Sequence, residues 1–497
     1  MSYNYQLYHE KLKKISDIIY AANVLQWDQE TYMPPKGATL RAQQLATLAG
    51  IAHQYFTDEK LGSLLSELLN DTRLSEKELK NVKQTHKDYH KQKKYSTDFV
   101  EELSRTVSET FQAWQLAKNN NDFKSYAPYL DKLLNLKKKE CEILGFDEHP
   151  YDALLDQYEP GAKSADIKNL FNDVKNNLVD FVKQIAQKPQ NDDAFMYADY
   201  DEQKQWDFSL YLLKQMGYDF EAGRQDKSTH PFTTHFNALD VRVTTRVNKN
   251  DLSEIIWSTI HEGGHALYEQ GLPISEYGLP SGEYISLGIH ESQSRLWENN
   301  VGRSLAYWEY NFPKLQEIFP QNLGEISVFD FYKAMNIVKP SLIRTGADEL
   351  TYHFHVLIRF ETEMALFEGN LAVKDLPEYW NFKYKEYLGI EVPNDTKGVL
   401  QDVHWSHGSF GYFPTYSLGS FYAAQFMHTA NQQISNLEEI IKAGNLLPLL
   451  EWLRNNIHQY GKQYTAEEIC YKITGEKLNF KYFMNYAKKK YSLIYNL

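Results

Sequence analysis

Residues 236–271, FNALDVRVTTRVNKNDLSEIIWSTIHEGGHALYEQG, change their hydrophobic period halfway along, and this change decides the expected fold. The first part alternates apolar or β-branched residues with polar ones, which predicts a β-strand. The alternating positions are Leu239, Val241, Val243, Thr245 and Val247. The second part has Asn250 or Asp251 as a possible N-cap and Gly271 at its end, so it predicts a helix.

The first 230 residues have the pattern of successive amphipathic helices. Apolar residues recur at helical spacing in residues 15–27, 39–56 and 164–186, and prolines punctuate the segments between them. No glycine- or serine-rich linker and no fixed-period repeat divides the sequence. We therefore expect a mostly α-helical fold with a small sheet just before the HEGGH helix, in a single domain spanning residues 1–497.

Composition excludes several classes of function. The 497 residues carry a net charge of −13 and no visible basic stripe, so a nucleic-acid partner is not expected. No uncharged apolar run reaches the roughly 18 residues that a membrane span requires. The N-terminus lacks the continuous apolar core of a signal peptide. The only cysteines, Cys141 and Cys470, form no disulfide framework, which favours a reducing, cytoplasmic location.

The HEGGH stretch has the spacing of a metal site. His261 and His265 are four residues apart, so both imidazoles project from one face of a helix, as two ligands of a zinc ion do. Glu262 follows the first histidine and can contact a metal-bound water, which is the logic of the HExxH motif. The alternative is a solvated helix face that carries two histidines.

A catalytic zinc needs a third protein ligand. The longer motif with a third histidine is absent, because position 271 is Gly271. A second helix is expected over residues 286–300, and Glu291 in its middle, with short serine neighbours, is the favoured ligand. Glu298 is expected in an outer contact or as a helix-face charge. The adjacent glycines Gly263 and Gly264 suggest that this helix or the sheet passes close to them, or that they form only a packing notch.

At this point the sequence resembles the thermostable metallocarboxypeptidase family of the Taq carboxypeptidase type. The matching motifs are WDQETYMPP (27–35), DVRVT (240–244), HEGGH (261–265), HESQSRLWEN (290–299), IRTGAD (343–348) and GVLQDVHW (398–405). The resemblance implies a helical zinc peptidase with a deep cleft, usually a homodimer, that removes C-terminal residues with broad preference. It makes Glu291 the third ligand. Residues 1–230 would flank the cleft, and residues 231–497 would bind metal and substrate.

A wider clan of oligopeptidases resembles the C-terminal part of the chain, where a histidine precedes a tyrosine by twelve residues. His404 and Tyr416 have that spacing and are expected to stabilise the oxyanion. A satisfied core histidine and a packed tyrosine are the alternative, with Tyr412 and His407 as nearby substitutes. Many clan members have an aspartate where this chain has Arg295, so the group that orients the zinc histidines stays open.

Peptide hydrolysis would use zinc-activated water, with Glu262 as the general base. Cobalt could replace zinc. A carboxypeptidase also recognises a free carboxylate, for which Arg344 is the first candidate and Arg242 and Arg246 are the next. The alternative for Arg344 is a salt bridge to Asp348, a residue that is also a possible partner of the zinc histidines.

The expected function is a zinc carboxypeptidase acting on peptides with a free C-terminus. A zinc endo-oligopeptidase of the same clan is the close alternative. A non-catalytic helical peptide-binding protein is a second alternative, and Glu262 argues against it, because a structural metal site needs no base.

Overall fold

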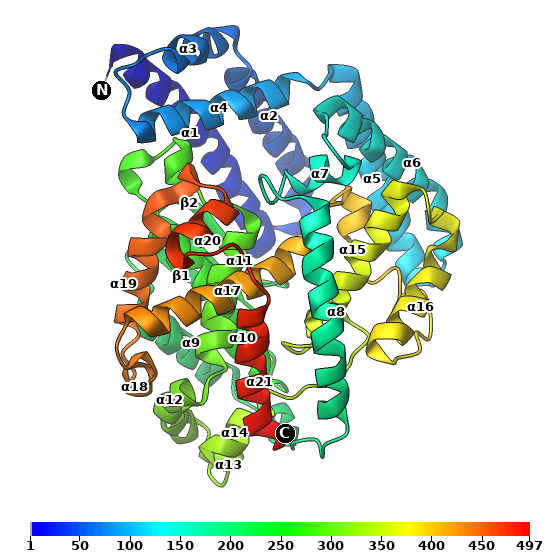
Figure 1. The fold of residues 1–497 in the computed structure, drawn as a ribbon, viewed down its shortest axis with the longest axis vertical. Coiled ribbons are helices and arrows are strands. Elements are labelled where there is room, and N and C mark those ends of the chain that lie inside the picture. Colours follow the sequence, from blue (N-terminus) through cyan, green and yellow to red (C-terminus); the bar gives the residue numbers. More distant parts are fainter. Residues whose placement is uncertain (1) are drawn as a thin grey trace. The chain divides into compact units, whose positions relative to one another are not determined.

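The computed structural model describes residues 2–497 and confirms the mostly α-helical class (Figure 1). The described chain divides into two compact units, each assembled from separate segments. The first unit comprises residues 1–93, 191–335 and 422–478, and the second comprises 94–190, 336–421 and 479–497. The HEGGH stretch lies in the first unit, and the segment from Arg344 to Phe421 lies in the second.

The first unit begins with four helices that pack around a small aromatic and leucine core. They are α1 (Tyr3–Thr31), α2 (Ala38–Phe56), α3 (Glu59–Leu69) and α4 (Glu76–Lys93). Ser2 caps α1 by accepting a hydrogen bond from the Tyr5 N–H, and Pro34–Pro35 separate α1 from α2. The core includes Tyr5, Tyr8, Leu12, Leu61, Leu65 and Val82. The helices expected over 15–27 and 39–56 are therefore present, and the first is longer than its apolar pattern.

The sheet lies just before the HEGGH helix, as expected. Its three strands, β1 (Gly223–Lys227), β2 (Thr233–Asn237) and β3 (Asp240–Thr245), run in the order β1-β3-β2. The central strand β3 pairs parallel with β1 and antiparallel with β2. The predicted strand is thus β3, but it is shorter than its alternating pattern. Leu239 precedes it and is 63% exposed, and Val247 follows it.

Helix α10 (Leu252–Gln270) packs against β2 and β3. The side chain of Asp251 caps it by accepting from the Ser253 N–H, and Gly271 ends it, as the sequence predicts. Of the two possible caps, Asp251 is the one used.

Further helices complete the first unit. They are α9 (Glu202–Met216), α11 (Leu287–Arg295), α12 (Leu305–Ile318), α13 (Pro320–Leu323), α14 (Val328–Ala334), α18 (Leu437–Lys442), α19 (Leu447–Asn456) and α20 (Ala466–Thr474). Helix α17 (Pro414–Gln433) begins in the second unit and ends in the first.

The second unit is helical in its described part. Its helices are α5 (Thr97–Asn120), α6 (Phe123–Leu144), α7 (Pro150–Leu155), α8 (Ser164–Ala186), α15 (Tyr352–Glu368), α16 (Leu376–Leu388) and α21 (Lys481–Tyr495). The helix expected over 164–186 coincides with α8. Thirteen residues of α15 are buried, and among them Arg359 and Glu363 carry charges that must find partners inside the protein.

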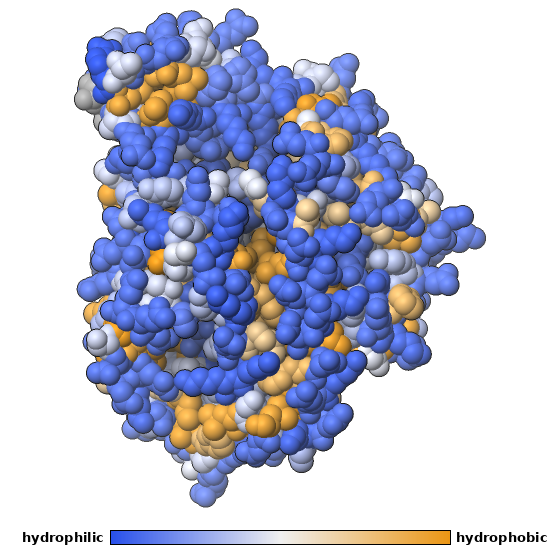
Figure 2. Space-filling model, viewed as in Figure 1, coloured by the Kyte–Doolittle hydropathy of each residue, from blue (hydrophilic) through white to orange (hydrophobic). Residues whose placement is uncertain are grey.

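The molecular face drawn in Figure 2 is mainly hydrophilic, with hydrophobic residues gathered in a few patches. Within residues 2–497, no helix combines the length and the apolar character that a membrane span requires.

Candidate metal centre

Helix α10 places both histidines of the HEGGH stretch on one face. The rings of His261 and His265 lie 4.9 Å apart, nearly perpendicular to each other. Their Nε2 atoms lie 3.7 and 3.4 Å from Oε2 of Glu291, respectively. One potential ligand atom from each of the three residues lies within 4.8 Å of the others. The three side chains predicted as metal ligands therefore converge on one point.

The paired glycines allow two neighbouring helices to approach α10. A Cβ on Gly264 would lie 2.7 Å from the Cα of Ser294 and 2.8 Å from the carbonyl oxygen of Gln293, both in α11. A Cβ on Gly263 would lie 2.8 Å from a methyl group of Leu213 in α9. Helix α11, which carries Glu291, is thus the element that passes close to Gly264, and any side chain there would push Glu291 away from the histidines.

Helix α11, which carries Glu291, differs from the helix expected over 286–300. Ser286 caps α11, which ends at Arg295, and a π-helical turn continues from Leu296 to Gly302. In an α-helix, a residue five positions on points about 140° away, whereas the wider π-turn brings it closer to the same face. Arg303 accordingly reaches Glu298, with 3.2 Å between Nη2 and Oε1.

The carboxylates of this cluster are neutralised by arginine. The Nε of Arg295 donates to Oε1 of Glu291 at 2.7 Å, and its Nη1 donates to Oε2 of Glu298 at 3.0 Å. Burial alone would raise the pKa values of both glutamates, but Arg295 and the histidines hold them well below the usual range. Both groups are therefore ionised at neutral pH, which is the state that metal coordination requires of a carboxylate.

Glu298 orients the first histidine. Its Oε2 lies 2.9 Å from Nδ1 of His261, which leaves Nε2 of that ring facing Glu291. This contact supplies the orienting group that the sequence left open. Asp348, the residue considered there, lies in the second unit and accepts hydrogen bonds from the backbone of its own loop, including Leu350 N–H and Thr351 N–H.

Glu262 lies beside this group of side chains, and one of its carboxylate oxygens faces Thr233. Thr233 on β2 donates from Oγ1 to Oε2 of Glu262 at 2.7 Å and contacts its carbonyl oxygen at 2.9 Å. Burial raises the pKa of Glu262 above its ordinary value. A buried carboxylate with a raised pKa next to three potential ligands has the properties of a general base.

The donor set fits a metal ion. Two imidazole nitrogens and one carboxylate oxygen are the ligands of a catalytic zinc site that keeps one position open. The hydrogen bond from Glu298 fixes His261 in the orientation that such a ligand requires.

The predicted oxyanion residues lie together in the second unit. His404 begins a short 3₁₀ turn (His404–His407), and its Nε2 lies 3.3 Å from the hydroxyl of Tyr416 at the start of α17. Burial lowers the pKa of His404 to about 4, so this ring is neutral at pH 7. Tyr412 packs against Tyr416, with 5.1 Å between ring centres, whereas the ring of His407 packs against Phe111 at a tilt of 34°.

Arg344 is buried and pairs with Asp402, not with Asp348, so the alternative salt bridge considered from the sequence is wrong. Its Nε and Nη2 lie 3.2 and 3.0 Å from Oδ1 of Asp402, and its Nη1 donates to the hydroxyl of Tyr352. The helix spacing suggested Asp348, but Arg344 lies in a short 3₁₀ turn (Arg344–Gly346) before α15, so the i,i+4 geometry does not apply.

The other candidate arginines also have partners. Arg242 on β3 forms a two-pronged ion pair with Asp240, at 2.9 Å for both contacts, and stacks over Trp27. Arg246 pairs with Glu254 at the start of α10. The WDQETYMPP motif thus supports the strand that carries Arg242.

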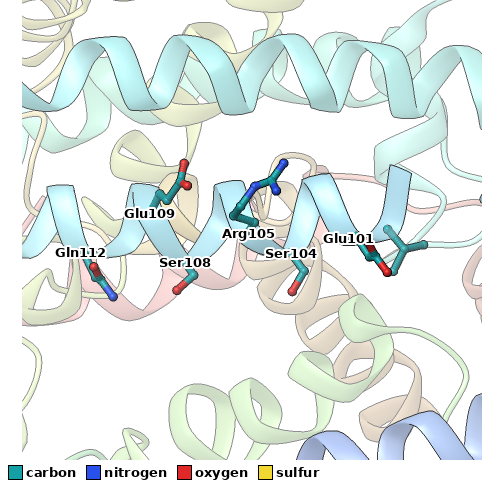
Figure 3. A pocket seen from close by; sticks show the side chains of 7 residues that line it. Glu101, Ser104, Arg105, Ser108, Glu109 and Gln112 are labelled. Atoms are coloured by element: carbon teal, nitrogen blue, oxygen red, sulfur yellow. The ribbon is translucent and has the colours of Figure 1, made fainter. Parts of the chain in front are cut away.

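A surface pocket lies along α5. The residues that line it include Glu101, Ser104, Arg105, Ser108 and Glu109, all from one helix, and Figure 3 shows them along its length. The side chains that line this pocket do not converge as metal ligands or catalytic groups would. The group formed by His261, His265 and Glu291 therefore remains the candidate site.

A mostly helical fold and a cluster that could hold a metal ion are compatible with a metal-dependent hydrolase. Comparison with known proteins gives the family. Residues 7–491 match the model of the Carboxypeptidase Taq (M32) metallopeptidase family. The chain belongs to this family, and it is therefore a metallocarboxypeptidase, a peptide hydrolase.

Relatives and solved structures agree over nearly the whole chain. It is 42% identical to Thermostable carboxypeptidase 1 of Thermus thermophilus, covering 94% of each chain. It is 39% identical to Carboxypeptidase 1 of Bacillus subtilis, covering 99% of this chain and 98% of the relative. The crystal structure of an M32 carboxypeptidase from Deinococcus radiodurans superposes with a TM-score of 0.98 at 35% identity, and both chains are fully covered.

Proposed function

We propose that the protein is a zinc-dependent carboxypeptidase that releases amino acids one at a time, with broad specificity, from the C-terminus of peptides. The observation that carries this proposal is the convergence of His261, His265 and Glu291 beside the buried carboxylate of Glu262. Cobalt is the expected substitute metal, because it accepts the same nitrogen and oxygen ligands.

The three ligands would hold a zinc ion that lowers the pKa of a water to about 7 and polarises the substrate carbonyl. Glu262 accepts the proton of the attacking water and passes it to the leaving amine. Thr233 keeps Oε2 of Glu262 occupied, so Oε1 is the oxygen available for this transfer. The raised pKa of Glu262 suits a group that must take up a proton and release it in each catalytic cycle.

His404 and Tyr416 are proposed to donate hydrogen bonds to the oxyanion. Tyr416 donates through its hydroxyl, and neutral His404 donates through a ring N–H. Support comes from their mutual contact and from the buried, neutral state of the histidine. Tyr412 and His407 are proposed to line the same substrate region.

Recognition of the substrate carboxylate is assigned to Arg344, with Arg242 as the second candidate. Each arginine already binds an aspartate, so a substrate would use the N–H groups that these pairs leave available. We further propose that both compact units form one catalytic domain, and that the protein is a homodimer in the cytoplasm. The two buried free cysteines are compatible with that location.

The test combines one variant with one substrate pair. Glu262→Gln should retain zinc and lower kcat by roughly 10²–10⁴-fold, because it removes the base but no ligand. Glu254→Gln, on the same helix, is the matched control and should keep wild-type kcat. Metal content by elemental analysis, together with the product ladder from one peptide as free acid and as C-terminal amide, provides the measurement.

Loss of zinc from Glu262→Gln would show that Glu262 is a ligand and that the assigned roles are wrong. Equal cleavage of the free acid and the amide at internal bonds would support the endo-oligopeptidase alternative.

A further inference from the structure

The two histidines of the metal centre are held in different ways. His261 has a hydrogen bond from Nδ1 to Glu298. Nδ1 of His265 is buried and has no hydrogen-bond partner among residues 2–497. A metal-binding histidine usually donates its other ring N–H to an acceptor, which fixes the plane of the ring. Something else must therefore set the plane of His265.

The ring of His290 lies against His265. The two rings are stacked, with 4.3 Å between centres and 22° between planes. His290 belongs to α11 and directly precedes Glu291. The proposed third ligand, Glu291, is therefore the chain neighbour of the residue whose ring covers His265. Offset stacking of aromatic rings fixes their relative orientation without any hydrogen bond.

His290 is itself firmly held. Its Nε2 lies 2.7 Å from Oε1 of Glu269, which follows His265 by one helical turn on α10. Tyr284 contacts the ring edge-on at 4.9 Å, and Tyr268 packs at 5.7 Å. The Glu269 side chain is 2% exposed. The hydrogen bond to Glu269 and the packing of the two tyrosine rings thus fix the plane of the His290 ring independently of His265.

Glu269 is supported by a further residue from the sheet. Its Oε1 lies 3.3 Å from Nδ1 of His235 on β2, and the other nitrogen of that ring faces the hydroxyl of Tyr20 at 3.4 Å. Tyr20 in turn donates to Glu283. A continuous, partly buried network of polar contacts therefore runs from α1 through the sheet to the ring that covers His265.

We propose that His290 is a positioning residue that sets the ring plane of His265 by stacking. The proposal rests on the proposed function, because it assumes that His265 is a metal ligand. One ligand histidine would then be oriented by a hydrogen bond and the other by an aromatic ring. Removal of such an outer support typically lowers metal affinity by about 10–100-fold.

Two substitutions of similar size separate stacking from hydrogen bonding. His290→Gln keeps a polar group that can bond to Glu269 and removes the ring. His290→Phe keeps the ring and removes the hydrogen bond. We expect His290→Gln to weaken zinc binding by about 10–100-fold, and His290→Phe to stay within about 3-fold of wild type. Zinc affinity is measured by competition with a chelator, and the ligand geometry by the visible absorption of the cobalt-loaded protein.

His458→Gln is the matched control. His458 is buried between the same two helices: its Nε2 contacts Gln293 of α11, and its ring packs on Tyr268 of α10. Neither contact involves a proposed metal ligand. This variant should keep the wild-type zinc affinity and cobalt spectrum, even if its melting temperature falls.

Wild-type affinity in His290→Gln would overturn the proposal, and so would an equal loss in His290→Phe and His290→Gln. An unchanged zinc affinity in His261→Ala would instead show that the ligand assignment has failed. The two failures are therefore distinguishable.

Discussion

Glu291 in the first unit and Glu363 in the second are both buried glutamates, but their surroundings differ. Glu291 lies beside Arg295 and two histidines. Glu363 accepts hydrogen bonds from neutral groups: the Tyr151 hydroxyl, the Trp405 indole and the Gly411 backbone N–H.

The two pKa values move in opposite directions. Burial acts to raise both, but Arg295 and the histidines hold the pKa of Glu291 well below its usual range. Burial raises the pKa of Glu363 to about 7, because neutral donors compensate only part of the lost hydration. Both carboxylates are buried and hydrogen-bonded, but Glu291 has a direct ion pair with Arg295, whereas Arg359 offsets only part of the effect of burial on the pKa of Glu363.

Glu363 also connects two points of one loop. Trp405 follows the proposed donor His404, and Gly411 precedes Tyr412. Gly411 has a φ of 89°, a conformation that favours glycine, so its N–H can reach the carboxylate where another residue would be strained. The charge state of Glu363 therefore bears on the loop that carries the proposed oxyanion residues.

The largest effect is expected when Glu291 loses its direct ion pair and, like Glu363, is left with no arginine bound to its carboxylate. Arg295→Met removes the cation between Glu291 and Glu298 and leaves two buried carboxylates without it. The metal-free protein should lose about 3–5 kcal/mol of unfolding free energy, and bound zinc should restore part of it. Urea unfolding with and without chelator measures both. Arg303→Met, which removes a cation from Glu298 but not from Glu291, should cost less; an unchanged stability in Arg295→Met would refute the charge-pairing account.

The next effect concerns the loop in the second unit. Tyr416→Phe keeps the ring and removes one proposed donor, so kcat should fall by about 10²–10³-fold with little change in KM. Steady-state kinetics on a free-acid peptide measure this. Phe413→Leu, a neighbouring change that removes no hydrogen-bond donor, is the control for packing. Wild-type kcat in Tyr416→Phe would transfer the role to Tyr412 or His407.

A smaller effect tests the titration of Glu363. Its pKa is about 7 in the folded protein and 4.5 ordinarily, so between these values the folded chain keeps a proton that the unfolded chain releases. Its contribution to stability is therefore greatest below pH 4.5, declines as pH rises to about 7, and is constant above that. The slope is at most about 1.4 kcal/mol per pH unit.

Glu363→Gln should remove this slope, because glutamine stays neutral at every pH. Urea unfolding of wild type and variant at several pH values between 5 and 8 gives the difference in their unfolding free energies. A difference that does not change with pH would mean that Glu363 keeps an ordinary pKa.

The smallest effect is expected at an ion pair that is exposed to solvent. Lys314 and Glu317 form an exposed ion pair on α12, with 3.1 Å between Nζ and Oε2. Glu317→Gln should change the unfolding free energy by less than about 0.5 kcal/mol, because solvent screens the pair. Thermal unfolding at low salt measures it. A cost comparable with that of Arg295→Met would show that burial is not what gives the inner pair its effect.

The sequence predicted those features that depend on neighbours along the chain. The cap at Asp251, the end of α10 at Gly271 and strand β3 all follow from local patterns, and the spacing of His261 and His265 predicted their shared face. Strands β1 and β2 were missed, because GRQDK and TTHFN show no clear alternation and exist through pairing with β3.

Features that depend on distant contacts also escaped the sequence. Nothing in IRTGAD indicates that Arg344 pairs with Asp402, more than fifty residues on. Glu363 lies in an unremarkable helical stretch, and only the fold brings Trp405 and Gly411 to it. A π-turn after Arg295 leaves no simple periodic signature, since one residue of extra length looks like ordinary helix.

That π-turn allows chain length to vary inside a helix. Deletion of one residue between Glu298 and Arg303 would let the segment wind as a regular α-helix, in which Arg303 would be the fourth residue after Glu298. Residues four apart in an α-helix share a face, so the ion pair between these two side chains would survive the deletion. Loops commonly absorb a gained or lost codon, and the π-turn gives this buried segment the same tolerance.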